Sequence, residues 1–427
     1  MDDKSRWDWD LGQRGIADMA QWRANFNWIE EPQVSPDGEQ IAAIVNQSQG
    51  EFTVCVNGQA WDSMFDKIWY LRFAPDGRLS ALISEMGEWT VALDGVPWKN
   101  KFGYVWQTMF GPDGKNIAVA VQRDMTYGMA LNDLPWEKSF PNMTNPTLGP
   151  DGTRTAAAVQ VADFGEGEIH KFQAGAFSAA IDGNPWETSF VNVWNMAISP
   201  DGQNLAAEVR VNLYDYTIAV NGKPWDQTFG CVWEPVFHPI NLSVAAPVRK
   251  DGKWSMAVDG GVVWDRRFVQ IWHQMFSSDG SKLAAIVAPK YGKWTVAVEG
   301  RPWSATFNDI VSDAVFSPDG QRIAAVAKNS GRWFVAVDGA VWTNFFDMAF
   351  QPVFSSDSNY VAVKYEQNGK YGIAVNDRLW DGGYDQIWDP VFSPAGDKLL
   401  LRTVKGDVYT RHVLSVADML GKGRAQK

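Results

Sequence analysis

The chain has 427 residues, of which 45% are hydrophobic, and it carries a formal net charge of −12. This acidic balance disfavours nucleic-acid binding, because neutralising phosphates requires clustered Lys and Arg. No apolar run reaches the roughly 18 residues of a transmembrane helix. The acidic N-terminus also lacks the apolar core of a secretory signal, so we expect a cytoplasmic protein, attached to a membrane only through partner subunits if at all.

Residues 1–21 are predicted to form an N-terminal arm, because they show none of the regularity of the later sequence. The arm contains Trp7 and Trp9 between acidic residues. Tryptophan is enriched at the hot spots of protein interfaces, which makes both side chains candidate partner-binding residues. The alternative is that the arm folds back onto the rest of the protein.

A repeated unit occupies residues 22–414. Its marker is the turn Ser-Pro-Asp-Gly or a close copy, and ten such turns follow one another, most of them 37 to 40 residues apart. Short apolar runs separated by Gly- and Asp-containing turns at this period are typical of the four-stranded blades of a β-propeller. We therefore predict an all-β protein, a β-propeller of ten four-stranded antiparallel blades.

A second marker, Trp-x-x-x-Phe or Trp-x-x-x-Tyr, lies in the predicted fourth strand of each unit except the last. That last unit starts at Trp388 and has three predicted strands, whereas an additional copy of the marker, Trp22–Phe26, precedes the first unit. We therefore predict that Trp22–Phe26 supplies the missing strand and closes a single ring. Two five-bladed rings are the alternative, but the short, uniform links between units favour one ring.

All but three of the 23 tryptophans, namely Trp7, Trp9 and Trp28, occupy recurring strand positions. Such regular placement indicates packing between blades, where each large aromatic side chain buries much apolar surface. An array of indoles that stacks ligands or carries electrons is the less favoured alternative. Partner-binding groups are therefore sought where the units differ from one another.

The fourth unit differs most, because an acidic and aromatic loop is inserted between its second and third predicted strands. The candidate partner-binding residues of this loop are Asp163, Phe164, Glu166, Glu168 and Phe172. The eighth unit has Val311 in place of the first-strand Trp and one extra residue, which predicts a β-bulge. Residues 415–427 are expected to form a tail whose basic end is solvated.

Motifs for catalysis or cofactor binding are missing from the sequence, which contains no nucleophile elbow, His-Glu-x-x-His, P-loop or Cys-x-x-Cys. The cysteines, Cys55 and Cys231, fall in different units and predict no disulfide. His238 and His273 are the histidines considered for a metal site across blades, but surface or turn roles are favoured. We predict no catalytic, cofactor-binding or metal-binding residues and no enzymatic activity.

The segments VFSPDGQRIAAVAKNSGRWFVAVDGAVW and MAISPDGQNLAAEV resemble the WD40-like (TolB-type) propeller repeat. The abundant Trp and the V-[DN]-G-x-P-W repeats also resemble the tryptophan-rich subunit of the Tmc transmembrane electron-transfer complex. This second resemblance implies a cofactor-free accessory subunit. Its partners would be a cytochrome b-type membrane subunit, an iron–sulfur subunit and a multihaem cytochrome c.

Three functions are then open. An accessory or scaffold subunit of a membrane-associated electron-transfer complex, acting through protein–protein contacts, fits the aromatic arm and the resemblance. A soluble propeller that binds a peptide or a small ligand fits the fold alone. A hydrolase or lyase is suggested only by analogy with other propellers.

Overall fold

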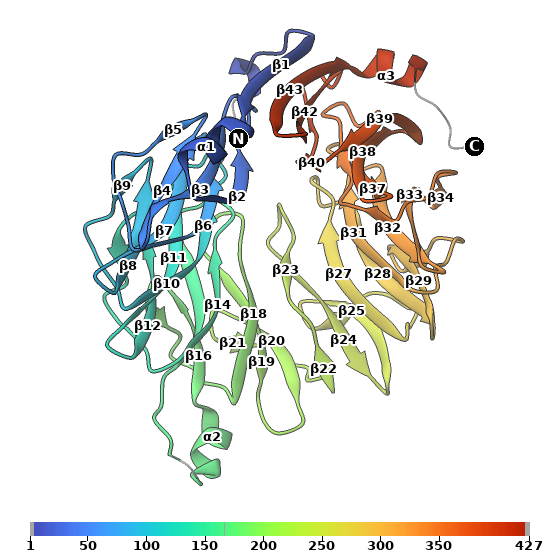
Figure 1. Ribbon diagram of the computed structural model, residues 1–427. Helices are drawn as coiled ribbons and strands as arrows, with labels where there is room; N and C mark the ends of the chain where they lie inside the picture. The colour runs from blue at the N-terminus through green and yellow to red at the C-terminus, as the bar shows by residue number, and fades with distance from the viewer. Residues whose placement is uncertain (1–3, 166, 423–427) are drawn as a thin grey trace. The chain divides into compact units, whose positions relative to one another are not determined.

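The computed structural model describes residues 4–165 and 167–422, and it consists of ten antiparallel sheets with few helices (Figure 1). Each sheet corresponds to one sequence unit, so the predicted all-β fold and the ten blades of the β-propeller are confirmed. The chain divides into two compact units, Ser63–Phe268 and Asp3–Asp62 with Val269–Lys427. We describe the blades of each unit separately and number them in chain order.

The first compact unit contains blades two to six. Its strands are β6 (Lys67–Phe73), β7 (Leu79–Glu85), β8 (Glu88–Leu93) and β9 (Val96–Pro97); β10 (Tyr104–Phe110), β11 (Ile117–Arg123), β12 (Thr126–Leu131) and β13 (Leu134–Pro135); β14 (Met143–Leu148), β15 (Thr155–Gln160), β16 (Phe177–Ile181) and β17 (Asn184–Pro185); β18 (Asn192–Ile198), β19 (Leu205–Arg210), β20 (Tyr216–Val220) and β21 (Lys223–Pro224); and β22 (Cys231–Val232), β23 (Val236–Phe237), β24 (Val244–Lys250), β25 (Lys253–Val258) and β26 (Gly261–Val262). One helix, α2 (Ile169–Gly175), lies between β15 and β16.

The second compact unit contains blade one and blades seven to ten. Its strands are β2 (Trp28–Val34), β3 (Ile41–Ser48), β4 (Glu51–Val56) and β5 (Gln59–Ala60); β27 (Gln270–Phe276), β28 (Leu283–Lys290), β29 (Lys293–Val298) and β30 (Arg301–Pro302); β31 (Ile310–Phe316), β32 (Ile323–Asn329), β33 (Arg332–Val337) and β34 (Ala340–Val341); β35 (Met348–Ala349), β36 (Val353–Phe354), β37 (Val361–Gln367), β38 (Lys370–Val375) and β39 (Arg378–Tyr384); and β40 (Gln386–Ile387), β41 (Val391–Phe392), β42 (Lys398–Lys405), β43 (Val408–Ser415) and β1 (Gly12–Asp18). Its helices are η1 (Lys4–Arg6), α1 (Met19–Asn25) and α3 (Val416–Lys422).

The Ser-Pro-Asp-Gly turns connect the first and second strands and are held by their own side chains. In blade seven, Ser277 Oγ donates to Asp279 Oδ1 over 2.6 Å, and the same carboxylate oxygen accepts from the backbone N–H of Ser281 over 3.0 Å. The hydrogen bond from Ser277, followed by those from Ser281, lowers the pKa of Asp279 to about 2. The aspartates of these turns therefore act as local caps of the backbone.

In blades one to eight the Trp-x-x-x-Phe marker lies after the fourth strand rather than in it, which corrects its predicted place, whereas in blade nine Trp380 and Tyr384 lie within the fourth strand β39 as predicted. In blade two, β9 ends before Trp98, and Phe102 then pairs back with Trp89 through an isolated bridge. The excursion places the Trp of one blade on the Asp-Gly turn of the next. A Cβ added to Gly183, which has φ +78°, would lie 3.1 Å from Trp136 Cγ. The turn therefore needs Gly both for its backbone conformation and for this contact.

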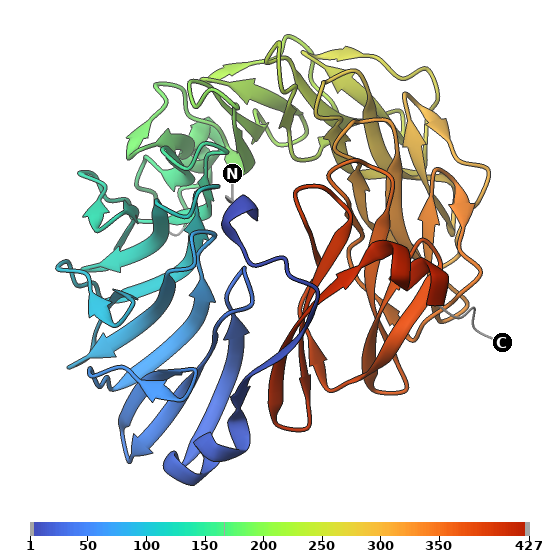
Figure 2. The same cartoon turned by 90° about the horizontal axis from the view of Figure 1, so that it is seen from above.

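Blade ten is completed by strand β1, which pairs antiparallel with β43 (Figure 2). The N-terminal closure of the last blade is thus confirmed, but its strand is Gly12–Asp18 and not Trp22–Phe26. The segment from Met19 to Asn25 is helical because it is rich in helix-forming residues and because the Asp18 side chain accepts from the N–H of Ala20. Trp22 nevertheless packs on a turn of the next blade as the other marker tryptophans do, since its Nε1 would lie 3.4 Å from a Cβ at Gly58 of blade one.

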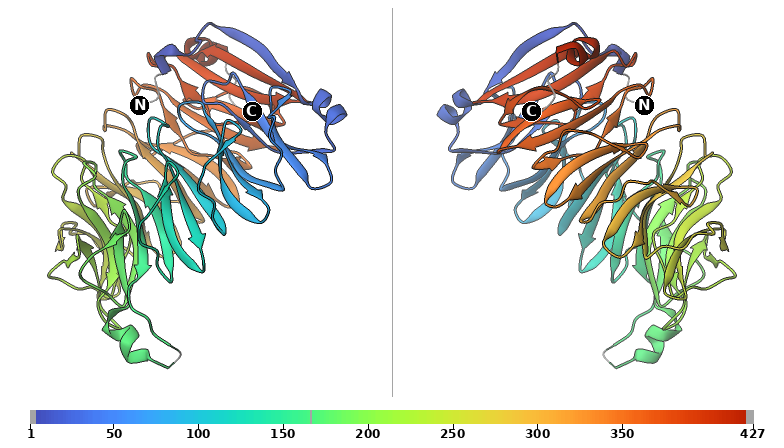
Figure 3. Two further views of the ribbon diagram at one scale, coloured as in Figure 1. Left: turned by 90° about the vertical axis from the view of Figure 1, so that its left-hand side faces the viewer. Right: turned by 90° about the vertical axis from the view of Figure 1, so that its right-hand side faces the viewer.

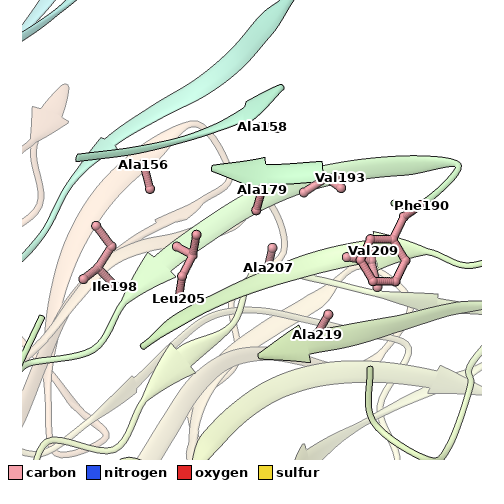
Figure 4. Packing of buried hydrophobic residues seen from close by; sticks show 10 residues of the cluster. All are labelled: Ala156, Ala158, Ala179, Phe190, Val193, Ile198, Leu205, Ala207, Val209 and Ala219. Atoms are coloured by element: carbon pink, nitrogen blue, oxygen red, sulfur yellow. The ribbon is translucent and has the colours of Figure 1, made fainter. Parts of the chain in front are cut away.

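The core lies between neighbouring blades and is built largely from small aliphatic side chains of their middle strands. Figure 4 shows the example of blades four and five, whose buried residues are Ala156, Ala158, Ala179, Phe190, Val193, Ile198, Leu205, Ala207, Val209 and Ala219. Ala and Val allow the faces of adjacent sheets to approach closely, while the Phe of the second marker fills the wider space. This arrangement agrees with the expectation that the markers serve packing.

The predicted β-bulge of blade eight is present, between Ser312 and Val315 of β31. It does not distinguish that blade, however, because the register shifts at the same place in the first strands of blades one, two, three, four, five and seven. In blades six, nine and ten the first strand is instead interrupted. The bulge therefore belongs to the repeat.

Candidate protein-interaction surfaces

The N-terminal arm folds back onto blade ten, as the alternative for this segment expects. Lys398 Nζ donates to the backbone oxygen of Trp9 over 2.9 Å, and the Arg411 guanidinium donates to that of Asp8. Both donors come from the long antiparallel pair β42 and β43. The arm is therefore tethered to blade ten through the backbone oxygens of Asp8 and Trp9.

Trp7 and Trp9 form a stacked pair, with ring centroids 6.0 Å apart and planes inclined by 19°. The Trp9 indole Nε1 donates to the backbone oxygen of Lys4 over 2.8 Å. Both side chains are half-buried. The structure thus brings the two predicted residues together, with part of each ring still accessible to a partner.

The inserted loop of blade four carries helix α2, which projects from its sheet (Figure 3). Phe164 and Phe172 pack on each other and on Phe177 at the base of the loop, with centroid distances of 5.8, 6.4 and 6.5 Å. These half-buried rings hold the loop together. Their aromatic character is therefore used inside the loop, in addition to any contact with a partner.

Of the charged candidate residues of the loop, one makes contacts within the loop and another is exposed. Glu168 accepts from the N–H of Gly165 over 2.8 Å and pairs with Lys171 at 2.8 Å, and its pKa is lowered by the Lys171 contact first and then by Gly165. Asp163 is exposed, whereas Glu166 lies outside the described residues. The apolar group that the loop exposes most is Ile169, at 64%, which the sequence reasoning did not single out.

A third surface was missed by the sequence reasoning. It consists of Trp69, Trp89, Tyr104 and Trp106, and we call it the aromatic cluster of blades two and three. Trp69 contacts Trp89 with a centroid distance of 4.7 Å, Trp89 contacts Tyr104 at 5.5 Å, and Tyr104 stacks on Trp106 at 6.1 Å. The rings form a continuous series along two neighbouring blades.

Much of this cluster faces solvent. Trp69 is 47% exposed and Tyr104 40%, whereas Trp89 is 7% exposed. Tyr70, which follows Trp69 in the chain, is 39% exposed but does not belong to the series of contacting rings. The Arg72 guanidinium lies 4.4 Å from the centroid of the Tyr70 ring. The expectation that first-strand tryptophans are used up by blade packing is therefore wrong for Trp69. The available signal was Tyr70 directly after Trp69, a second large aromatic side chain where the other units have a polar residue.

Three blades place an ionisable side chain where the others have an apolar one. The position is in the second strand, opposite the residue of the first strand that comes just before its bulge or lies in its interruption. It is occupied by Glu208 in blade five, Lys364 in blade nine and Arg402 in blade ten. The apolar equivalents are Ile44, Leu82, Ala120, Ala158, Pro247, Ile286 and Val326.

The histidines considered for a metal site have other roles. His238 Nδ1 accepts from the backbone N–H groups of Ile240 and Asn241 at 3.1 and 3.2 Å, and His273 Nε2 lies 2.9 Å from the backbone oxygen of Ala314 in the next blade. Among residues 4–165 and 167–422, no three His, Cys, Asp or Glu side chains gather as a metal site would require. Over the same ranges, no helix has the length and apolar composition needed to cross a membrane.

No protein-family model matches the chain, and no curated protein matches its sequence. Among solved structures, it is similar to one described as the crystal structure of the eukaryotic initiation factor, with 12% identity and a TM-score of 0.47 over 82% of this chain and 96% of that one. Another, from a study of two prolyl endopeptidases, has 12% identity and a TM-score of 0.36 over 79% of this chain and 54% of that one, so the chain spans about half its length. The class, a β-propeller, rests on the chain's own ten sheets.

Proposed function

We propose that the protein is a protein-binding scaffold. The observation that carries the proposal is the aromatic cluster of blades two and three, in which Trp69 and Tyr104 are each more than one third exposed. Exposing adjacent large aromatic side chains is unfavourable unless a partner covers them, and Trp and Tyr dominate the binding energy of protein interfaces. The half-buried pair Trp7 and Trp9 and the loop of residues 163–172 are proposed as further contact regions.

More specifically, we propose that the scaffold is an accessory subunit of a membrane-associated electron-transfer complex and holds no cofactor of its own. The support for this part is the resemblance of the Trp-rich repeats to the subunit of such a complex. Its partners would be a cytochrome b-type membrane subunit, an iron–sulfur subunit and a multihaem cytochrome c. The protein would then lie in the cytoplasm, at the inner face of the membrane.

Affinity purification of the tagged full-length protein from its native cells, followed by mass spectrometry, tests the proposal. Changing Trp69 and Tyr104 together to Ser should weaken partner binding by about 2 kcal/mol or more, because two anchor side chains are lost. Tyr291, which is 94% exposed on blade seven, provides the matched control, and Tyr291→Ser should retain the partners. Circular dichroism would verify that all variants remain folded.

The predicted regions are tested in the same way, with Trp7 and Trp9 changed to Ala and with residues 163–172 replaced by Gly and Ser. If all three groups of variants retain the same partners at full yield, docking occurs elsewhere and the proposed surfaces are wrong. Recovery of haem and iron–sulfur proteins with the intact chain would support the electron-transfer assignment. Stable partners without redox centres would contradict that assignment but leave the scaffold role in place.

A further inference from the structure

Lys364 is the second of the three ionisable residues that occupy the apolar position of the second strand. It lies in β37 of blade nine, and its side chain is 16% exposed. Its ammonium group lies 4.3 Å from the centroid of the Phe350 ring. Withdrawing a lysine from water in this way costs free energy, so the position invites a functional explanation.

A cavity of about 310 Å³ opens beside this ammonium group. Three of its lining residues are aromatic. Two of these, Phe350 and Tyr371, contact each other with a distance of 6.2 Å between ring centroids. It is lined by Pro32, Phe350, Lys364, Tyr371, Gln386, Ile387 and Trp388. This volume, and a largely apolar lining with one charged group, are typical of sites for small organic ligands.

The counterion of Lys364 is Asp389, whose carboxylate lies 2.7 Å from Nζ. Asp389 belongs to the interruption between β40 and β41, and its side chain is 65% exposed. The ammonium is therefore held in place by the fold, whereas its partner is on the solvent side and free to exchange. A carboxylate brought by a ligand can replace an exposed side-chain carboxylate at modest cost.

We propose that this cavity binds a small organic monocarboxylate with an aromatic or apolar body. Its carboxylate would pair with Lys364 in place of Asp389, and its body would pack against Phe350, Tyr371 and Trp388. The ammonium group of Lys364 would recognise the carboxylate of the ligand, and the aromatic rings would recognise its apolar body. This site is independent of the protein-binding scaffold role, and it adds a small-molecule ligand to it.

Isothermal titration calorimetry of the full-length protein with 3-phenylpropionate tests the proposal, with 3-phenylpropanamide as its uncharged counterpart. The acid should bind and the amide should bind at least about tenfold more weakly, because the amide lacks the charge that Lys364 recognises. No heat of binding with the acid, or equal affinity for both compounds, would overturn the proposal.

Two substitutions at the site should act in opposite directions. Lys364→Met should weaken binding of the acid about tenfold or more, whereas Asp389→Asn should strengthen it several-fold by removing the competing carboxylate. If Lys364→Met does not fold, the Asp389→Asn variant and the amide still decide the matter. Weaker binding by Asp389→Asn would contradict the proposal, since binding would then depend on the carboxylate that the ligand is proposed to displace.

The ion pair of Lys370 and Asp385 provides matched controls on the same two blades, and neither residue lines the cavity. Lys370→Met and Asp385→Asn change the same charges at an exposed pair. Both variants should bind 3-phenylpropionate like the unmodified protein. If these control variants changed the affinity as much as the Lys364 and Asp389 variants do, the effect would come from the net charge of the region, and the proposal of a defined site would be refuted.

Discussion

Blades five and ten place side chains of opposite charge at the same position of the second strand, and these two side chains differ in how many hydrogen-bond partners they have. Arg402 of blade ten donates to the backbone oxygens of Ser35 and Pro36 in blade one, at 3.2 and 3.4 Å, and to that of Asp389 at 2.6 Å. Glu208 of blade five accepts from Asn195 Nδ2 at 2.9 Å. Both residues are buried, at 8% and 6% exposure.

The difference in hydrogen-bond partners shows how a buried charge affects the boundary between two blades: it stabilises the boundary when it is well compensated and weakens it when it is not. The guanidinium satisfies several carbonyl groups of a neighbouring turn, so it joins two blades, and burial lowers its pKa against the effect of nearby acids. Burial raises the pKa of Glu208 to about 7, with the Asn195 hydrogen bond acting against this shift and the charge of Glu234 adding to it. Arg402 thus stabilises its boundary, whereas ionised Glu208 weakens its own.

The largest effect should follow from removing the N-terminal part of blade ten. Deleting residues 1–26 removes strand β1 and Trp22, exposes the edge of β43 and should lower the free energy of unfolding by about 5 kcal/mol or more. Differential scanning calorimetry measures the change. Deleting only residues 1–11 keeps β1 and is the control. A protein lacking residues 1–26 that melts with the intact one would refute the closure of blade ten by this segment.

A smaller but still large effect is expected from Arg402→Met. The substitution keeps much of the side-chain volume but leaves the carbonyl group of Asp389 without the Arg402 donor and leaves that of Ser35 with only the N–H of Gly38, so it should cost about 3 kcal/mol. Urea unfolding at pH 7 would measure it. An unchanged midpoint would show that the buried guanidinium contributes nothing to the boundary and would remove the contrast with Glu208.

The third effect depends on pH. The carboxyl of Glu208 has a pKa of about 7 in the folded protein and 4.5 as its ordinary value, so between these values the folded state holds a proton that the unfolded state has lost. Its contribution to stability is therefore complete below pH 4.5 and disappears as the pH rises through 7.

Glu208→Gln should accordingly increase the free energy of unfolding at pH 8 by on the order of 2 kcal/mol and change it little at pH 5. Urea unfolding of both proteins across this range gives the comparison. A loss of stability in the variant at pH 8 would mean that the ionised carboxylate is well compensated, and Glu208 would then resemble Arg402.

The repeat made most of the fold predictable. The spacing of the Ser-Pro-Asp-Gly turns predicted the blades, and the displaced marker around Trp22 predicted that the N-terminus completes the last one. The strand itself was not recognised, because Gly12–Asp18 contains two Gly residues and has no clear alternation of apolar and polar side chains. Its extended conformation is imposed by the long partner strand β43.

The interaction surfaces were harder to predict, since a repeat shows which positions recur but not which copies are covered. Trp69 and Trp272 occupy equivalent positions, yet Trp69 is 47% exposed and Trp272 is half-buried beside Trp294. The sequence singled out Trp7 and Trp9 because they lie outside the repeat, but it did not indicate the tethering of this segment by Lys398 and Arg411. Such contacts join residues nearly four hundred positions apart, beyond the reach of local patterns.

The pairing of β1 with β43 also determines when the protein can finish folding. Residues 12–18 leave the ribosome early, but their partner is synthesised some 390 residues later, which takes about 20 to 80 seconds at typical rates of translation. Until then, the N-terminal strand has an unpaired edge while the following blades form one after another. The growing chain therefore passes through a long interval in which chaperones or premature strand partners compete for its first segment.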